Sequence, residues 1–137
     1  MHVIDSPRSV SPRSENIHHW AVEYIGKRYE PGSTGPDSYD CWGLMYCVYK
    51  TVFGILLPEY PGITLVSLST QCEVIQHDIA TSWEEVELPF DGCGIAMSKQ
   101  SAIHHVGVYI TADGGRVLHA TENAGVVTNT FRQLQIY

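Results

Sequence analysis

The hydrophobic pattern of the chain changes at Trp83, and this change constrains the fold more than any other feature. Before Trp83, apolar residues recur every three or four positions, as on one face of a helix. After it, apolar and β-branched residues alternate in short segments separated by Gly, Asp, Asn or Pro. The first pattern predicts helices over 14–28, about 40–53 and 70–80. The second predicts strands over 84–88, 94–98, 105–111, 116–120 and 126–130. Helices followed by strands predict an α+β domain, with helices packed on one face of a mostly antiparallel sheet.

The length predicts a single domain, because 137 residues can bury one hydrophobic core. We expect this domain to span residues 15–137, preceded by a flexible arm over residues 1–14, where Ser and Pro dominate. The formal net charge is −7, with 8 Lys and Arg against 15 Asp and Glu. Binding of nucleic acid through phosphates needs clustered cations, so the sequence argues against a nucleic-acid partner.

The sequence predicts neither an export signal nor a membrane span. The first residues contain prolines and arginines but no apolar run. No later stretch approaches the ~18 consecutive apolar residues that a spanning helix requires. We therefore expect synthesis in the cytoplasm, where free thiols are the usual state.

Cys41 is the candidate nucleophile. Asp40 is a favourable N-cap and Gly54 a favourable stop, so Cys41 would begin a helix. Unpaired backbone N–H groups at a helix start stabilise a thiolate and lower the pKa of a cysteine. The other cysteines lack such a position and are interpreted as packing residues: Cys47, Cys72 and Cys93.

The nucleophile needs a base from another part of the chain, and two histidines in the strand region can supply it. Strand alternation places His105 and Gly107 on the same face of their strand. A three-residue loop over 112–114, with a left-handed Gly114, would pair Gly107 with His119. The two histidines would then be diagonal neighbours, about 7–8 Å apart at the backbone. Gly107 would also leave His119 without a facing side chain.

These residues fit the roles of a catalytic triad. Cys41 would attack an amide carbonyl, and its backbone N–H would help to bind the oxyanion. His105 would take and return the proton, while His119 would fix the tautomer of His105. The same three residues could instead bind zinc with one open position, but no short-spaced ligand pair accompanies them, and we expect no cofactor. The remaining histidines are expected at the surface: His2, His18, His19, His77 and His104.

Three blocks, in this order and spacing, resemble the NlpC/P60 cysteine peptidases of the papain-like superfamily. The blocks are YEPGSTGPDSYDCWGL at 29–44, HVGVYI at 105–110 and VLHA at 117–120. The resemblance implies a papain-like fold and cleavage of peptidoglycan stem peptides, with γ-D-glutamyl–diaminopimelate as the expected bond. It implies the catalytic residues Cys41, His105, His119 and Tyr29, of which Tyr29 would polarise the substrate carbonyl. We assign substrate binding to Asp40, Trp42 and Gly107.

Two longer stretches resemble the tail-associated cell-wall peptidases of phages. They are DCWGLMYCVYKTVFGILLPEY and LHATENAGVV, with Trp42 in place of the family's usual serine after the cysteine. This resemblance implies a protein made in the host cytoplasm and carried in the virion tail tip, with other tail tip or hub proteins as partners. It would act in the periplasm or cell wall. Asp91 and Gly92 stand where the family usually has a Gly-Asp pair.

Two other functions are alternatives. A structural module of a tail tip would keep the fold without turnover. Iodoacetamide would separate the two, because an active enzyme should lose its Cys41 thiol well ahead of Cys47. An acyltransferase or a CHAP-type amidase of the same superfamily is disfavoured. The cysteine precedes the histidine here, and His119 stands where CHAP enzymes use a carboxylate or amide.

Overall fold

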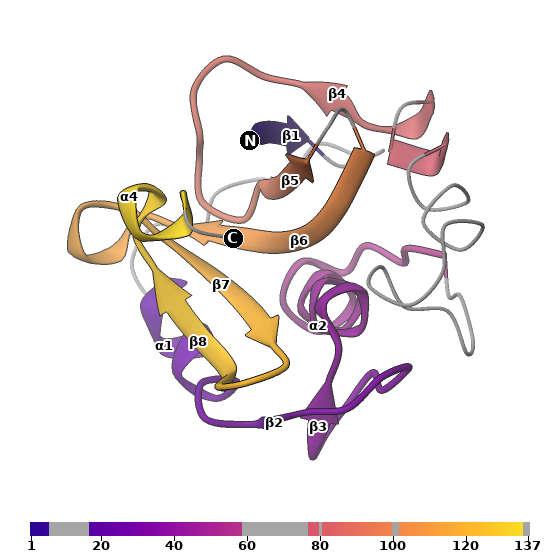
Figure 1. Cartoon of the computed structure of the whole chain (residues 1–137), viewed down its shortest axis with the longest axis vertical. Coiled ribbons are helices and arrows are strands. Elements are labelled where there is room, and N and C mark those ends of the chain that lie inside the picture. Colours follow the sequence, from indigo (N-terminus) through magenta and orange to yellow (C-terminus); the bar gives the residue numbers. More distant parts are fainter. Residues whose placement is uncertain (6–16, 59–76, 80, 100–101, 136–137) are drawn as a thin grey trace.

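A six-stranded antiparallel sheet forms the centre of the molecule, in the order β4-β1-β5-β6-β7-β8 (Figure 1). This computed structural model describes residues 1–5, 17–58, 77–79, 81–99 and 102–135. The sheet strands are β1 (His2–Asp5), β4 (Glu84–Glu85), β5 (Gly94–Lys99), β6 (Ala102–Ile110), β7 (Arg116–Thr121) and β8 (Gly125–Asn129). A separate parallel pair consists of β2 (Arg28–Tyr29) and β3 (Ser38–Tyr39). The α-helices whose bounds lie within these ranges include α1 (Ile17–Val22), α2 (Cys41–Val48) and α4 (Phe131–Leu134).

The first residues of the chain form a strand, contrary to the flexible arm expected over residues 1–14. β1 lies between β4 and β5 and pairs with both. Ile4 is buried, and His2 Nδ1 lies 3.0 Å from a carboxylate oxygen of Glu85. The four residues of β1 carry little local pattern, and their partners in β4 lie about eighty residues later in the chain. The Ser- and Pro-rich composition therefore led to the wrong prediction of a flexible segment here. Residues 6–14 lie outside the described part, and the domain boundary at residue 15 stays a prediction.

α2 and the π-helical turn that continues it together span the helix that the sequence predicted over about 40–53. Its N-cap is Asp40, whose side chain accepts a hydrogen bond from the backbone N–H of Gly43 at 2.6 Å. After Val48 the helix continues as a π-helical turn over Tyr49–Phe53. It ends at Gly54, whose φ of 70° lies in the left-handed region that glycine tolerates.

α1 is shorter than the helix predicted over 14–28, because the chain after Val22 turns to join β8. The backbone N–H of Gly26 donates to the carbonyl oxygen of Val126 at 2.9 Å. The backbone N–H of Val126 in turn donates to the carbonyl oxygen of Lys27 at 2.9 Å. These bonds occupy backbone groups that a longer helix would use within itself.

Most of the helix predicted over 70–80 falls outside the described residues. In the part of this region that is described, residues 77–79 and 81–82 are helical. All five predicted strands are present, although β4 is shorter than expected. The mixture of helices with a large antiparallel sheet confirms the α+β class. None of the helices in the described ranges is long and apolar enough to cross a membrane.

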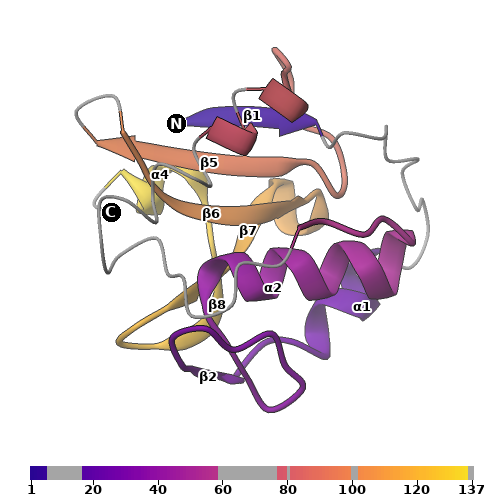
Figure 2. The same cartoon turned by 90° about the vertical axis from the view of Figure 1, so that its right-hand side faces the viewer.

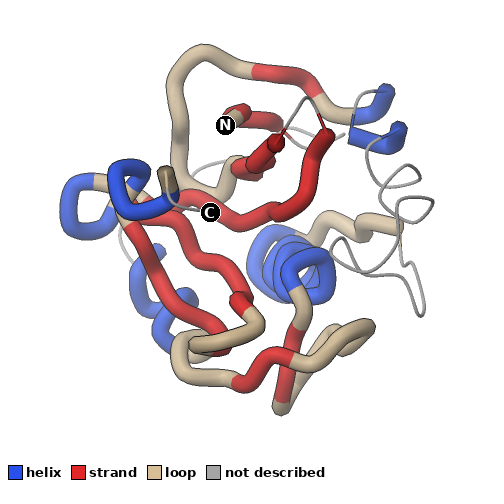
Figure 3. Tube along the Cα trace, viewed as in Figure 1, coloured by secondary structure: helices blue, strands red, loops and turns tan. Residues whose placement is uncertain are grey.

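Helices cover both faces of the sheet. α1 and α2 lie on one side, and the strands curve around α2, which packs against β6 and β7 (Figures 2 and 3). The larger core lies between α2 and the sheet, and includes Leu44, Met45, Val48, Val106, Val108 and Leu118. A smaller cluster includes strand residues that alternate with these, namely Ile95, Tyr109 and Val117, and also Leu134. Leu134 belongs to α4, so this short helix covers the opposite face, where no helix was predicted.

The hairpin between β6 and β7 has the predicted register. Its pairs include Ile110↔Arg116 and Val108↔Leu118, which place Gly107 and His119 opposite each other by continuation. The turn over 112–114 is a single 3-10 turn, and Gly114 is left-handed with a φ of 81°. The odd loop length thus brings both histidines to the same face of the sheet.

Candidate functional site

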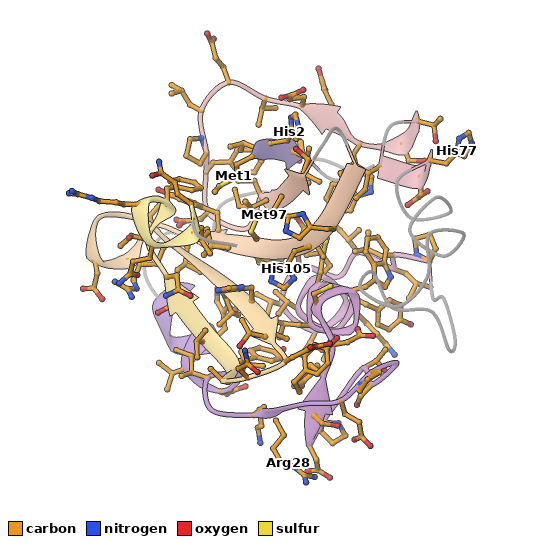
Figure 4. All side chains as sticks on the ribbon, in the orientation of Figure 1. Met1, His2, Arg28, His77, Met97 and His105 are labelled. Atoms are coloured by element: carbon orange, nitrogen blue, oxygen red, sulfur yellow. The ribbon has the colours of Figure 1, made fainter. Side chains whose placement is uncertain are left out.

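The candidate nucleophile and the two candidate histidines are all buried in the folded chain. Cys41 begins α2, His105 lies in β6 and His119 lies in β7. Their exposed fractions are 3%, 8% and 0%, respectively. Figure 4 shows the side chain of His105 extending from β6.

A buried carboxylate positions Cys41 by holding a loop against the start of α2. Asp40 accepts hydrogen bonds from the backbone N–H of Gly43 at 2.6 Å and from that of Gly32 at 2.7 Å. A side chain at Gly43 would collide with the carbonyl oxygen of Ser33, so this glycine permits the close approach of the loop. Burial raises the pKa of Asp40, while the two backbone hydrogen bonds lower it.

The thiol of Cys41 lies where β7 separates from β6. The pairing of β6 with β7 ends at Val108, whereas its pairing with β5 continues to Ala102. Alternate N–H groups of a strand point to opposite neighbours, and that of Tyr109 bonds to β5. The N–H of Val106 therefore points to the side that β7 has left. This N–H group, from the residue after the candidate base, lowers the pKa of the Cys41 thiol and so favours the thiolate.

The pKa of Cys41 shifts in the opposite direction to that expected. Burial raises it to about 12, and the neighbouring Asp40 carboxylate adds to the rise. The backbone N–H groups of Val106 and Trp42 oppose this shift but do not cancel it. The sequence prediction considered the helix start alone, whereas the loss of hydration outweighs the helix start in the folded chain. The thiol is therefore neutral at pH 7.

The two histidines and Asn129 form a hydrogen-bonded chain. His105 Nε2 lies 2.8 Å from His119 Nδ1, and His119 Nε2 lies 2.7 Å from Asn129 Oδ1. Burial lowers the pKa of His105 to about 3, with further contributions from His119 and His104. Burial also lowers the pKa of His119, against the opposing hydrogen bond to Asn129. Both imidazole rings are therefore neutral at pH 7.

Tyr29 is half-buried in β2. Burial raises the pKa of its phenol, and the charges of Cys41, Asp40 and Glu122 raise it further. These contributions keep the phenol protonated at neutral pH. Tyr29 pairs with Tyr39 in β3, two residues before Cys41, which brings β2 to the start of α2. Tyr29 is thus a hydrogen-bond donor close to the candidate nucleophile.

The residues assigned to substrate binding make structural contacts. Asp40 caps α2, and the buried Trp42 donates from Nε1 to the carbonyl oxygen of Pro58 at 2.9 Å. A Cβ at Gly107 would lie 2.6 Å from Cγ1 of Val117 and 3.1 Å from Cβ of His119, so this glycine makes room for the neighbouring strand. Contact with substrate stays a prediction for all three residues.

The other cysteines occupy positions that agree with packing. Cys93 is buried, and its sulfur accepts a hydrogen bond from the backbone N–H of Phe90 at 3.4 Å. Cys47 is half-buried, with its sulfur 3.8 Å from the hydroxyl of Tyr39. Cys72 lies outside the described residues.

The remaining histidines only partly follow the expectation of surface positions. His77 is exposed, whereas His2 and His104 are half-buried. His2 lies against Ser98 at 3.3 Å as well as Glu85. The side chains of His18 and His19 are outside the described part.

Sequence reasoning missed Asn129, the partner of His119. Asn129 ends β8 and is followed by the capping box of α4, in which Thr130 and Gln133 bond reciprocally. A Thr followed three residues later by Gln is a recognisable start signal for a helix. This signal could have revealed α4, although not the contact between Asn129 and His119.

The zinc site considered as an alternative would use Cys41, His105 and His119. Over the described ranges, no group of three or more His, Cys, Asp or Glu residues is arranged to hold a metal ion. The nitrogens of His105 and His119 face each other at 2.8 Å instead of converging on a common point.

Comparisons with known proteins identify the fold. The model of the NlpC/P60 family matches residues 26–135. Among solved structures, the chain is similar to the NlpC/P60 domain of the peptidoglycan hydrolase SagA. The identity is 20%, the alignment covers 85% of this chain and 88% of that chain, and the TM-score is 0.55.

A second solved structure is similar over nearly the whole chain. It is a Staphylococcus aureus subsp. aureus Mu50 protein described as similar to a lipoprotein of the NLP/P60 family, at 24% identity and a TM-score of 0.61. The alignment covers 94% of this chain but only 41% of that chain. No curated protein matches the chain. The two likenesses confirm the predicted papain-like NlpC/P60 fold.

Proposed function

The chain belongs to the NlpC/P60 family, and from this premise we propose that it is a cysteine peptidase that hydrolyses amide bonds in peptidoglycan stem peptides. The observation that carries the proposal is the juxtaposition around Cys41. Cys41 begins α2, and its thiol has its pKa lowered by the backbone N–H of Val106, the residue directly after His105. His105 Nε2 in turn lies 2.8 Å from His119 Nδ1. The peptidoglycan hydrolase SagA, whose domain has the same fold, supports the substrate class.

In the first half of the proposed reaction, the sulfur of Cys41 attacks the amide carbon while its proton passes to His105. The carbonyl oxygen becomes an oxyanion, and the backbone N–H of Cys41 at the helix start helps to bind it. His105 then returns the proton to the leaving amine as the C–N bond breaks. A thioester between Cys41 and the acyl part of the substrate remains.

In the second half, water attacks the thioester carbon and gives a proton to His105. The C–S bond breaks, the carboxylic acid leaves, and the sulfur recovers the proton. His119 holds the ring of His105 through the 2.8 Å hydrogen bond in both halves. Tyr29, which is kept protonated beside the thiol, donates a hydrogen bond to the substrate carbonyl. Asp40, Trp42 and Gly107 shape the site around these groups.

Both reacting groups are neutral in the resting site, and this favours proton transfer during attack over a preformed ion pair. Burial disfavours the thiolate of Cys41 and the imidazolium of His105 alike. A substrate that enters must therefore supply polar contacts that stabilise the charge developing during attack. The proposed enzyme would then react fastest with a substrate that fills the site.

Digestion of purified muropeptides, with products identified by mass, tests the proposal. The wild-type chain is expected to release two fragments whose combined mass exceeds that of the substrate by one water. His105→Ala should abolish release, because it removes the group placed to take the proton from Cys41. A wild-type chain that leaves every stem peptide intact would contradict the proposal.

For the finer assignment, we propose that the bond cleaved is γ-D-glutamyl–diaminopimelate and that the chain acts in the tail tip of a phage. The stretches around Trp42 and His119 that resemble phage tail-associated peptidases support this, as does the net charge of −7, which does not attract the chain to an anionic wall. Delivery by a particle assembled in the host cytoplasm, with tail tip or hub partners, would bring the enzyme to the cell wall. Fragment masses identify the bond, and detection of the chain in purified particles tests the location.

A catalytically silent tail tip component is the second candidate. The observation in its favour is the enclosed site, with Cys41 only 3% exposed and its thiol neutral. A silent component would bind neither stem peptides nor acyl groups at Cys41. Turnover of muropeptides by the wild-type chain excludes it.

A further inference from the structure

The short C-terminal helix α4 connects to the candidate base through a chain of side-chain hydrogen bonds. The chain runs from Gln133 through Asn129 and His119 to His105. We infer that Asn129 and Gln133 are positioning residues that fix which ring nitrogen of His105 carries its proton. The inference deepens the proposed function and rests on it for its catalytic consequence.

We call this hydrogen-bond chain from Gln133 to His105 the relay. Its donors and acceptors can be assigned one after another from a group that can only donate. The backbone N–H of Thr130 donates to Oε1 of Gln133 at 2.9 Å. The Gln133 atom at that position must therefore be the amide oxygen, because an amide NH₂ cannot accept. The same oxygen lies 3.3 Å from the side-chain amide of Asn129, so the Asn129 atom that faces it must be the donor, Nδ2.

The orientation of the Asn129 amide then fixes the tautomer of His119. With Nδ2 directed at Gln133, the oxygen Oδ1 is directed at His119 Nε2, 2.7 Å away. An oxygen accepts, so Nε2 of His119 carries the proton. The buried ring is neutral, so its Nδ1 is unprotonated and accepts.

The tautomer of His119 in turn fixes that of His105. Nδ1 of His119 lies 2.8 Å from Nε2 of His105, so Nε2 of His105 is the donor. The neutral ring of His105 then has its lone pair on Nδ1, and Nδ1 is the atom that would take the proton from Cys41. One backbone N–H at the start of α4 thus determines the chemistry of a ring two strands away.

The opposite orientation of the Asn129 amide would reverse every step. Its NH₂ would donate to His119 Nε2, His119 Nδ1 would donate to His105 Nε2, and His105 would carry its proton on Nδ1. A protonated Nδ1 cannot act as the base. The two candidate orientations therefore correspond to an active and an inactive tautomer, and Gln133 selects between them.

α4 is placed firmly enough to act as the end of the relay. Leu134 is 1% exposed and anchors α4 in the smaller core cluster. The hydroxyl of Thr130 accepts the backbone N–H of Gln133 at 3.2 Å, which closes the capping box. Asn129 itself pairs with Val117 in the ladder between β7 and β8. Asn129 is thus held both by the strand pairing of β8 and by its contact with α4.

Nitrogen NMR of the full chain, labelled with ¹⁵N, tests the relay without any substrate. Ring correlation spectra distinguish a histidine protonated on Nε2 from one protonated on Nδ1. We expect both His105 and His119 to carry their proton on Nε2 in the wild-type chain. A proton on Nδ1 of either ring would overturn the inference, whether or not the chain cleaves stem peptides.

Variants then separate positioning from folding. Asn129→Ala removes the acceptor for His119, and is expected to mix the tautomers and lower kcat with little change in KM. A fall of about tenfold is expected, which corresponds to about 1.4 kcal/mol, the size of one well-made hydrogen bond. Asn129→Asp keeps an acceptor towards His119 and should restore the Nε2 tautomer. Arg132→Ala is the matched control, since Arg132 is an exposed residue of α4 outside the relay.

The role of Gln133 is tested in two backgrounds. In the wild-type background, Gln133→Ala should allow the Asn129 amide to turn and should lower kcat, whereas Gln133→Glu keeps the acceptor and should not. In the Asn129→Asp background, Gln133→Ala should have no further effect, because both carboxylate oxygens accept. Equal effects of Gln133→Ala in the two backgrounds, or unchanged tautomers in Asn129→Ala, would overturn the inference. If the wild-type chain proves inactive, the ring spectra of the same variants still distinguish the two tautomers and decide the question.

Discussion

Gly107 makes room for the hairpin that joins the two histidines, and its replacement by alanine tests that arrangement. A Cβ at this position would lie 2.6 Å from Cγ1 of Val117, 2.9 Å from the carbonyl oxygen of Leu118 and 3.1 Å from Cβ of His119. The carbonyl oxygen of Leu118 is a backbone atom, and Cβ of His119 is attached directly to the backbone, so neither can rotate away. β7 must therefore shift relative to β6 in the Gly107→Ala variant.

The shift should affect stability and catalysis together. Overpacking in a well-packed sheet costs about 1–3 kcal/mol of unfolding free energy. For a domain of this size, a loss of ~2 kcal/mol lowers Tm by ~8 °C. The hydrogen bond of 2.8 Å between His105 and His119 would be lengthened by the same shift. Misplacement of a catalytic group by ~1 Å costs about 10²-fold in rate, so kcat should fall by about that factor.

The assay compares Gly107→Ala with Gly94→Ala, a matched control in the adjacent strand β5. A Cβ at Gly94 would lie 2.8 Å from Cγ1 of Ile4 and 3.0 Å from Cζ3 of Trp83, so the steric stress is similar but no histidine is involved. Thermal unfolding and muropeptide cleavage well below Tm are measured for both variants. Both should lose stability, and only Gly107→Ala should also lose kcat. Equal losses of kcat in the two variants, or full activity in Gly107→Ala, would refute the proposed dependence of the site on this hairpin.

Three further outcomes follow from the burial of the site. The order expected from the sequence alone, with Cys41 alkylated before Cys47 in an active enzyme, is reversed by the burial of Cys41. Iodoacetamide should modify Cys47 before Cys41 in the folded chain, because Cys41 is 3% exposed and neutral, so this order no longer separates the enzyme from a silent component; peptide mapping by mass would report it. Faster modification of Cys41 would indicate an opening that the structure lacks. Asp40→Ala should lower the unfolding free energy by ~2–4 kcal/mol in urea titrations, since it removes the N-cap and the bond to the loop, and an unchanged midpoint would contradict that role. Finally, the unfolded chain takes up a proton at His105 near pH 6.5, whereas the folded chain resists it until about pH 3. The unfolding free energy should therefore fall as the pH drops through this window, by up to ~1.4 kcal/mol per pH unit, and His105→Gln should reduce the slope.

Local signals were sufficient to predict the elements that carry the site. The N-cap Asp40 and the stop Gly54 defined α2 because both act within one turn of the helix. The register of the β6–β7 hairpin followed from strand alternation and one left-handed glycine, Gly114. Alternation and loop length together were enough to predict that His105 lies beside His119.

Features that depend on distant contacts were not predictable in the same way. β1 is held by strands about eighty to ninety residues away, and its four residues alone carry no distinctive pattern. The pKa of Cys41 depends on how completely the folded chain removes water from the thiol, and a helix start cannot reveal that. Asn129 was missed because its partner, His119, lies on the neighbouring strand β7.

The kcat/KM for a purified stem peptide, compared between Cys41→Ala and Cys47→Ala, tests the central claim most directly. Both variants remove one sulfur from the same helix, but only Cys41 stands at its start beside Val106 and His105. Cys41→Ala should lose cleavage by about 10⁴-fold or more, as expected for removal of a nucleophile, while Cys47→Ala should remain close to wild type. Cleavage by Cys41→Ala at the wild-type rate would contradict the account.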